Sequence, residues 1–166
     1  IPLYDEDFVV VVPEGHTLDG RQDLQLAALD ELDLLLLDDG HCLHDQIVDL
    51  CRRADINPIS STTAITRASS LTTVMQLVVA GLGSTLIPVS AVPWECTRSG
   101  LSTANFGPDV TANRRVGLVY RSSSSRAEEF QQFAKILQRA FMEARTKAHD
   151  TGLQLKAGDS IIPVES

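Results

Sequence analysis

Short apolar runs alternate along this chain with segments in which apolar residues recur at helical spacing. Residues 8–12 form one such run and residues 32–37 another, and each is closed by proline or by aspartate and glycine. Short runs with these flanks are typical of buried strands. Strands that alternate with helices predict an α/β fold in which neighbouring strands pair in parallel.

The other elements follow from the same patterns. Further strands are predicted at residues 62–66, 84–87 and 116–120, a helical turn around 26–29, and helices at 42–54, 71–80 and 126–145. Asn57-Pro58 ends the first helix, and Ser69 or Ser70 can cap the second, which ends at Gly81. The apolar stripe of this second helix is too wide for one packing face. It is expected either to be buried within its own lobe or to make a dimer contact.

Composition narrows the class of protein. A chain of 166 residues with 43% hydrophobic residues can bury the core of one domain or of two small lobes. No apolar run approaches the roughly 18 residues of a membrane span, so no membrane association is expected. The net charge of −8 disfavours contact with nucleic acid phosphates, which bind basic surfaces. Any DNA contact is therefore expected in a region outside this chain.

The start of the chain and its cysteines suggest a cellular compartment. The chain begins with Ile-Pro-Leu rather than with methionine or a signal peptide, and we interpret it as part of a longer protein. Three cysteines cannot all pair within one chain, and no other feature indicates secretion. A reduced, cytoplasmic protein is expected.

Two cysteines lie in a pattern that predicts redox chemistry. Residues 40–46 read Gly-His-Cys-Leu-His-Asp-Gln, and Cys51 follows Cys42 by nine residues. Cys42 comes after a glycine turn and begins a predicted helix, where backbone N–H groups and the helix dipole favour the thiolate that attacks peroxide. A second cysteine within reach of a rearrangement is typical of a sensor cysteine with its resolving partner.

This motif resembles that of the OxyR group, the peroxide-responsive LysR-type transcription regulators. The group's Gly-His-Cys-Leu-Arg-Asp-Gln is matched except that His44 replaces arginine, and Cys51 falls where the group has its resolving cysteine. The resemblance continues through Ala-Ser-Ser-Leu at 68–71, Ala-Gly-Leu-Gly-Ser-Thr-Leu-Ile-Pro at 80–88, and Arg114 with the residues that follow it. It covers most of the chain.

The resemblance implies an architecture. In these regulators a helix-turn-helix domain precedes two α/β lobes similar to type 2 periplasmic binding proteins. Residues 8–105 would then form one complete lobe that carries the redox cysteines, and residues 112–146 the returning strand and long helix of the second lobe. The DNA-binding domain and the entering half of the second lobe would lie outside this chain. Residues 147–166 are expected to form a disordered C-terminal tail.

The resemblance also implies a function, that of a stoichiometric peroxide sensor rather than an enzyme. Peroxide would oxidise Cys42 to a sulfenic acid, which would form a disulfide with Cys51 and remodel residues 42–60 and the oligomer. His41 and Arg114 are expected to hold the Cys42 thiolate by charge or hydrogen bonding. No cofactor or metal is expected. The expected partners are hydrogen peroxide, promoter DNA through the absent domain, RNA polymerase, and further copies in a homodimer or homotetramer.

Each of these assignments has an alternative. His41 could simply cap the helix, and Arg114 could be a surface charge. His44 lowers the local positive charge relative to arginine, and Cys96 is interpreted as a bystander. The whole chain could instead be a metabolite-sensing LysR-type effector domain or a thiol peroxidase. The cysteines with His41 and His44 could also form a zinc site.

Two structural consequences follow. If Cys42 and Cys51 share one helix, they are about 13 Å apart along its axis and cannot bond until the helix unwinds. The unwound segment is expected to repack against helix 71–80. The aromatic stripe of helix 126–145 has no partner in the chain, so another polypeptide is expected to cover Phe130, Phe133 and Phe141.

Overall fold

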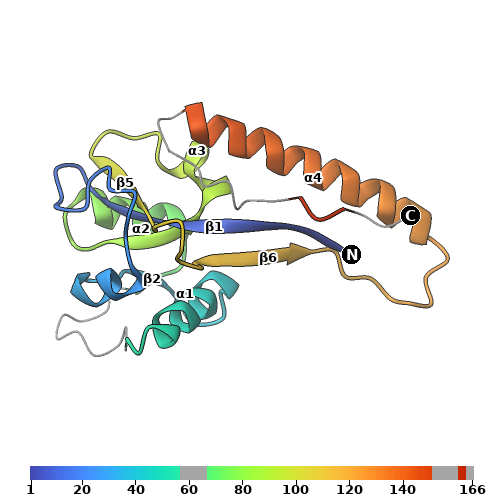
Figure 1. Ribbon diagram of the computed structural model, residues 1–166, viewed down its shortest axis with the longest axis horizontal. Coiled ribbons are helices and arrows are strands. Elements are labelled where there is room, and N and C mark those ends of the chain that lie inside the picture. Colours follow the sequence, from blue (N-terminus) through green and yellow to red (C-terminus); the bar gives the residue numbers. More distant parts are fainter. Residues whose placement is uncertain (57–66, 151–160, 164–166) are drawn as a thin grey trace.

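The computed structural model describes residues 1–56, 67–150 and 161–163, and its framework is one long strand, β1 (Pro2–Pro13) (Figure 1). The second half of β1 pairs with β4 (Thr85–Pro88) on one side and β5 (Leu101–Asn105) on the other. Its first half pairs with β6 (Asn113–Gly117). The strand therefore joins two parts of the fold, a larger one around its second half and a smaller one in which its first half pairs with β6.

The larger part, which we call the cysteine lobe, surrounds the second half of β1. A small parallel sheet pairs β2 (Leu36–Leu37) with β3 (Arg67–Ala68), and α1 (Cys42–Arg53) lies beside it. The other elements are α2 (Leu71–Val79), α3 (Val92–Glu95) and the 3₁₀ turns η1 (Leu26–Glu31) and η2 (Val89–Ala91). Most of these elements contribute side chains with 1% exposure or less, among them Val10, Leu29, Leu36, Leu50, Met75 and Leu86.

The predicted helices are confirmed to within a few residues. Helix α1 begins at Cys42 as expected, and Ser70 caps α2 by accepting a hydrogen bond of 3.2 Å from the N–H of Thr73. Val74, Met75 and Val78 of α2 are buried within their own lobe, as one of the two expectations had it. The strand expected at 62–66 lies outside the described residues. The sequence patterns missed β5 and α3.

The expectation of parallel pairing is wrong for the main sheet, where β1 is antiparallel to β4, β5 and β6. It holds for β2 with β3 and for a parallel bridge between Leu34 and Ser84. The start of β1 also differs from the strand predicted at residues 8–12. The strand begins at Pro2, and its charged residues Asp5, Glu6 and Asp7 interrupt the apolar pattern on which the prediction was based. Period and composition do not report strand direction, which depends on how the chain returns to the sheet.

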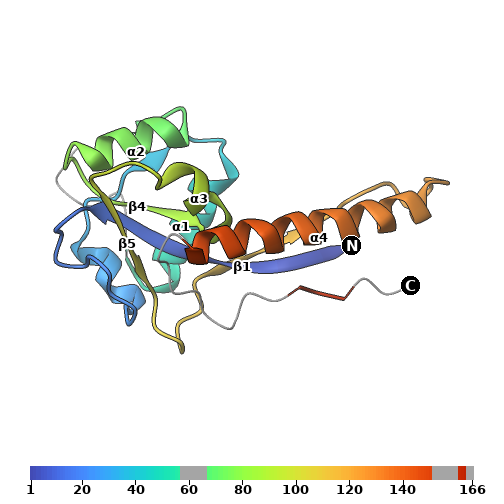
Figure 2. The same ribbon diagram turned by 90° about the horizontal axis from the view of Figure 1, so that it is seen from above.

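Part of the C-terminal segment that was expected to be disordered has a defined structure. Helix α4 (Ala127–Asp150) continues past residue 146 and runs along β1 (Figure 2). Beyond it, Ile161 bridges to Tyr4, and the side-chain amide of Gln138 donates a hydrogen bond of 2.7 Å to the carbonyl of Ile162. The expectation of a disordered tail is therefore wrong for residues 147–150, 161 and 162. The predicted last strand also shifts, from 116–120 to β6.

The aromatic stripe of α4 is only partly uncovered. Phe141 is 3% exposed and stacks on Tyr4 of β1 at 3.7 Å between ring centroids. Phe130 stacks on Tyr120 at 4.6 Å, whereas Phe133 is 47% exposed. The expectation that another polypeptide covers all three is wrong for Phe141, because the chain's own first strand covers it. Among the described residues, no helix is long and apolar enough to cross a membrane.

Candidate functional site

Cys42 is the first residue of α1 and is exposed. Gly40 turns the chain with a φ of 96°, a left-handed conformation that side chains disfavour, and so delivers His41 and Cys42 to the surface. The first N–H groups of a helix have no carbonyl partner within it and carry the positive end of the dipole. Cys42 is therefore placed at the N-terminal end of the helix, where a small oxidant can reach it.

Cys51 lies on the same helix but is fully buried, with Ile47 and Leu50 beside it in the core. Burial raises the pKa of the Cys51 thiol to about 11. The thiol is therefore neutral at pH 7, and a neutral thiol is a poor nucleophile. While α1 stays folded, Cys51 is neither exposed nor activated.

The separation of the two cysteines confirms the geometric expectation. Both are free thiols on one continuous helix, nine residues apart in sequence. At 1.5 Å per residue they are about 13 Å apart along the axis, whereas a disulfide needs Cα atoms within about 7 Å. A bond between them requires part of α1 to unwind.

His44 lies inside the protein rather than beside Cys42. It is 8% exposed, its Nδ1 is 2.8 Å from the carbonyl oxygen of Leu37, and its Nε2 is 3.2 Å from Oδ1 of Asp39. The other oxygen of Asp39 accepts a hydrogen bond of 2.6 Å from Arg67. The sequence suggested only a smaller local charge at position 44. The structure shows that His44 attaches the first turn of α1 to the end of β2.

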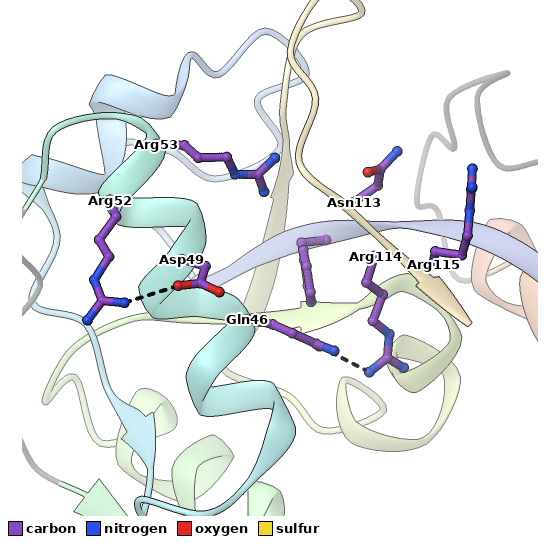
Figure 3. A pocket seen from close by; sticks show the side chains of 8 residues that line it. Gln46, Asp49, Arg52, Arg53, Asn113, Arg114 and Arg115 are labelled. Atoms are coloured by element: carbon purple, nitrogen blue, oxygen red, sulfur yellow. Dashed lines mark hydrogen bonds and ion pairs between the residues drawn. The ribbon is translucent and has the colours of Figure 1, made fainter. Parts of the chain in front are cut away.

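Arg114 is part of a buried ion pair. It lies on β6 directly opposite Glu6 of β1, and its Nη2 is 2.6 Å from Oε1 of that fully buried carboxylate. Its Nη1 donates a long hydrogen bond of 3.5 Å to Oε1 of Gln46, one turn of α1 beyond Cys42 (Figure 3). The alternative of a plain surface charge does not fit, since the Arg114 side chain is only 22% exposed. Its observed link to α1 is through Gln46.

His41 and Cys96 complete the predicted set. His41 is the exposed N-cap residue of α1, but its side chain makes no capping hydrogen bond. Cys96 follows α3 and is half-buried, away from α1. Burial, and then the charge of Glu95, raise the pKa of Cys96 to about 12, so this thiol is neutral at pH 7.

The residues of the alternative zinc site are not brought together. Cys51 is buried in the core, and both ring nitrogens of His44 already face the Leu37 carbonyl and Asp39. Within residues 1–56, 67–150 and 161–163, no group of three or more His, Cys, Asp or Glu side chains is arranged to hold a metal ion.

A pocket that the sequence analysis missed lies between α1 and β6 (Figure 3). It has a volume of about 660 Å³ and is lined by Phe8, Gln46, Asp49, Arg52, Arg53, Asn113, Arg114 and Arg115. Four of these residues are arginines and one is an aspartate, so the lining is basic in a chain that is acidic overall. The sequence feature that could have indicated this pocket is the pair of arginine doublets at 52–53 and 114–115. The two doublets are far apart in sequence, and only the folded chain brings them to the same pocket.

Comparisons with known proteins agree on one family. The model described as "LysR substrate binding domain" matches residues 1–142. The "Probable hydrogen peroxide-inducible genes activator" of Mycobacterium leprae is 48% identical over 137 residues, which cover 82% of this chain and 43% of that protein. The "DNA-binding transcriptional dual regulator OxyR" of Escherichia coli K12 is 35% identical over 139 residues, with the same two coverages of 82% and 43%. The chain thus spans less than half the length of these relatives.

Solved structures of Corynebacterium glutamicum OxyR are similar in both sequence and fold. A cysteine mutant has a TM-score of 0.88 at 75% identity, covering 94% of this chain and 48% of that one. A cysteine-to-serine mutant with hydrogen peroxide bound has a TM-score of 0.89 at 76% identity, covering 99% and 50%. The oxidised form has a TM-score of 0.77 at 79% identity, covering 94% and 48%. The family model and these matches show that the chain belongs to the LysR substrate binding domain family, as a regulatory domain of the OxyR type.

Proposed function

We propose that this chain is the hydrogen-peroxide-sensing part of a LysR-type transcription regulator and that Cys42 is the sensor. The observation that carries the proposal is the contrast between two cysteines on one helix: Cys42 is exposed at its start, and Cys51 is buried near its end. An exposed thiol can meet peroxide, and a buried one can resolve the product only after a structural change. A relative solved with hydrogen peroxide bound shares 76% of the aligned sequence.

The chemistry proceeds in two balanced steps. The Cys42 thiolate attacks one oxygen of peroxide, which gives a sulfenic acid and releases hydroxide. The Cys51 thiolate then attacks the sulfenic sulfur, which forms the disulfide and releases a second hydroxide. His41, exposed next to Cys42, and Arg114, linked to the same helix through Gln46, are the residues we propose to favour the Cys42 thiolate.

The conformational step has support from the matched structures. Two Corynebacterium glutamicum OxyR structures cover the same 94% of this chain at similar identity, yet the cysteine mutant fits with a TM-score of 0.88 and the oxidised form with 0.77. The fold described here has both cysteines as free thiols and is less similar to the oxidised form than to the mutant. Oxidation is proposed to remodel residues 42–60 and, through them, contacts between subunits.

The wider role follows from the relatives, whose names describe regulators of transcription. We propose that the complete protein is cytoplasmic, forms a homodimer or homotetramer, and binds promoter DNA through a helix-turn-helix domain outside this chain. The disulfide would change the spacing of those domains and their contact with RNA polymerase. The sensor turns over no substrate in this scheme.

The test is a titration of the purified protein with hydrogen peroxide, with thiols and disulfides mapped by mass spectrometry. One equivalent should produce a Cys42–Cys51 disulfide, and Cys51→Ser should leave a sulfenic acid that dimedone traps on Cys42. Cys42→Ser should abolish the reaction, and Cys96→Ser should leave it unchanged. Equal reaction in protein without Cys42 would show that the sensor assignment is wrong.

A further inference from the structure

The two carboxylate oxygens of Asp39 contact two different segments of the chain. Oδ1 lies 3.2 Å from Nε2 of His44, in the first turn of α1. Oδ2 accepts a hydrogen bond of 2.6 Å from Nη1 of Arg67, the first residue of β3. Asp39 therefore holds residues 44 and 67 at one point, which is the turn after β2.

His44 completes this attachment through its second nitrogen. Its Nδ1 lies 2.8 Å from the carbonyl oxygen of Leu37, and the side chain is buried. Both ring nitrogens thus face oxygen acceptors, one at the end of β2 and one in the turn that follows it. The charged groups of the network are Asp39, from the turn after β2, and Arg67, from β3.

The stretch held in this way contains the cysteine that must move. Cys51 lies between residues 44 and 67, and Cys42 lies just outside them, at the start of the same helix. Bringing the two sulfurs together requires α1 to unwind, because about 13 Å separates them along its axis. The link between His44 and Asp39 opposes that unwinding. Cys42 is already exposed, so attack on peroxide needs no such movement.

We propose that Asp39 is a positioning residue which, with His44 and Arg67, holds α1 folded and so sets the rate at which Cys51 resolves the Cys42 sulfenic acid. This inference rests on the proposed function. The network acts on the second step only, in which the Cys51 thiolate attacks the sulfenic sulfur and hydroxide leaves. The first step, from thiolate and peroxide to sulfenic acid, proceeds with the network intact.

The experiment measures the two steps separately in the purified protein. Sulfenic acid formation is followed by dimedone trapping at short times, and disulfide formation by mass spectrometry after rapid quenching. Asp39→Asn removes the charge with little change of shape. It should speed the second step about threefold to tenfold, the range that two partly exposed ion pairs supply, and leave the first step unchanged. Arg67→Gln removes the charged partner of Oδ2 of Asp39 and should also speed the second step.

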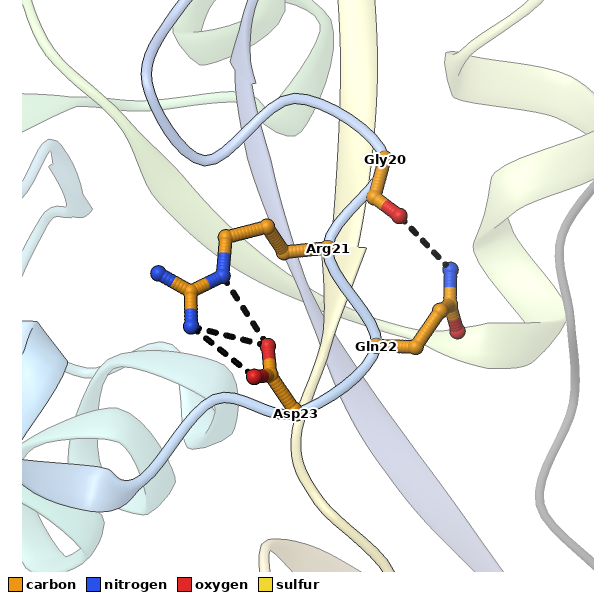
Figure 4. Close-up of polar contacts among 4 residues, drawn as sticks. All are labelled: Gly20, Arg21, Gln22 and Asp23. Atoms are coloured by element: carbon orange, nitrogen blue, oxygen red, sulfur yellow. Dashed lines mark hydrogen bonds and ion pairs between the residues drawn. The ribbon is translucent and has the colours of Figure 1, made fainter.

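Asp23→Asn is the matched control. Asp23 pairs with Arg21 through two hydrogen bonds of 2.9 and 3.0 Å, in a loop of the same lobe (Figure 4). Its side chain is 68% exposed, against 70% for Asp39, and the substitution removes the same charge. The rate of the second step in Asp23→Asn should equal that in the wild type. Equal rates in Asp39→Asn and the wild type, or equal acceleration in both variants, would overturn the proposal.

A conservative variant separates this role from a general loss of stability. Asp39→Glu keeps the negative charge that Asp39→Asn removes, so its second-step rate should lie closer to that of the wild type. Acceleration in Asp39→Glu as large as that in Asp39→Asn would contradict the role of the Asp39 carboxylate. Absence of any disulfide in the wild type would instead refute the proposed function.

Discussion

Cys42 and Cys51 differ in environment more than their shared helix suggests. Cys42 is exposed, whereas the Cys51 side chain has no exposed surface, and burial raises the pKa of its thiol to about 11. A buried, neutral thiol is shielded from oxidants and from other thiols while the helix is folded. At the scale of the single residue, burial therefore sets the order of the two oxidation steps in the proposed mechanism.

The buried thiol predicts a dependence of stability on pH. The Cys51 pKa is raised from 9.0 to about 11 in the folded state, so the neutral thiol stabilises the fold fully below pH 9. That stabilisation is lost as pH rises from about 9 to about 11, and amounts to on the order of 2 to 3 kcal/mol. Urea unfolding of the reduced protein at about pH 8 and about pH 11 should show this fall.

The comparison is made in a Cys96→Ala background, because the raised pKa of Cys96 gives a loss of the same sign. Adding Cys51→Ala should lower the free energy of unfolding at pH 8 but flatten its decline toward pH 11. The same decline with and without Cys51 would show that its thiol is not buried in the folded state.

At the scale of the element, α1 is the part of the lobe that must change if Cys42 and Cys51 form the proposed disulfide. Its apolar face packs Leu43, Ile47 and Leu50 into the core, each worth roughly 1.5 to 3 kcal/mol of burial. Its polar attachments are His44 to the end of β2 and Gln46 to Arg114. Unwinding gives up both kinds of contact, so the oxidised segment must find new apolar surface, for which α2 is the neighbour we propose.

Hydrogen exchange on reduced and oxidised protein checks this expectation. Backbone amides of α1 should lose protection on oxidation, because the helical hydrogen bonds between the cysteines are broken. Protection of α2 should change as well if the segment repacks there. Helix α4 serves as the internal control and should exchange equally in both states. Equal protection of α1 in both states would exclude the switch, however readily the disulfide forms.

At the scale of the whole molecule, β1 connects the parts that meet at the site. It pairs with β6, which carries Arg114, and with β4 and β5 of the cysteine lobe. The basic pocket takes one wall from α1 and another from β6, so unwinding α1 removes part of its lining. The proposed unwinding of α1 would therefore change both the redox site and the pocket.

The single tryptophan tests whether the rest of the molecule stays in place. The ring centroid of Trp94, in α3, lies 5.2 Å from the ammonium of Lys147, in the last part of α4, so the contact joins two helices that are far apart in sequence. Neither residue belongs to the segment that oxidation rearranges, so the Trp94 emission maximum should be the same in reduced and oxidised protein. Lys147→Met should shift it equally in both states. A redox-dependent shift would mean that α3 and α4 move against one another.

Local features of this protein could be read from its sequence. The bounds of α1, the cap at Ser70 and the positions of Cys42 and Cys51 depend on residues within a few positions of one another, and the structure agrees with each. The fold class followed from the resemblance, and the family match confirms it. Such features are predictable because helical spacing, capping and a short motif are properties of contiguous chain.

The tertiary structure decided what depends on segments meeting across the chain. Antiparallel pairing along β1 buries Glu6 against Arg114, although 108 positions separate them. The inward orientation of His44 depends on where β2 ends and where Arg67 returns. The two arginine doublets form one pocket because α1 lies opposite β6. Periodicity and composition carry no information about these contacts, since strand direction and side-chain partners are selected by the packing of the whole core.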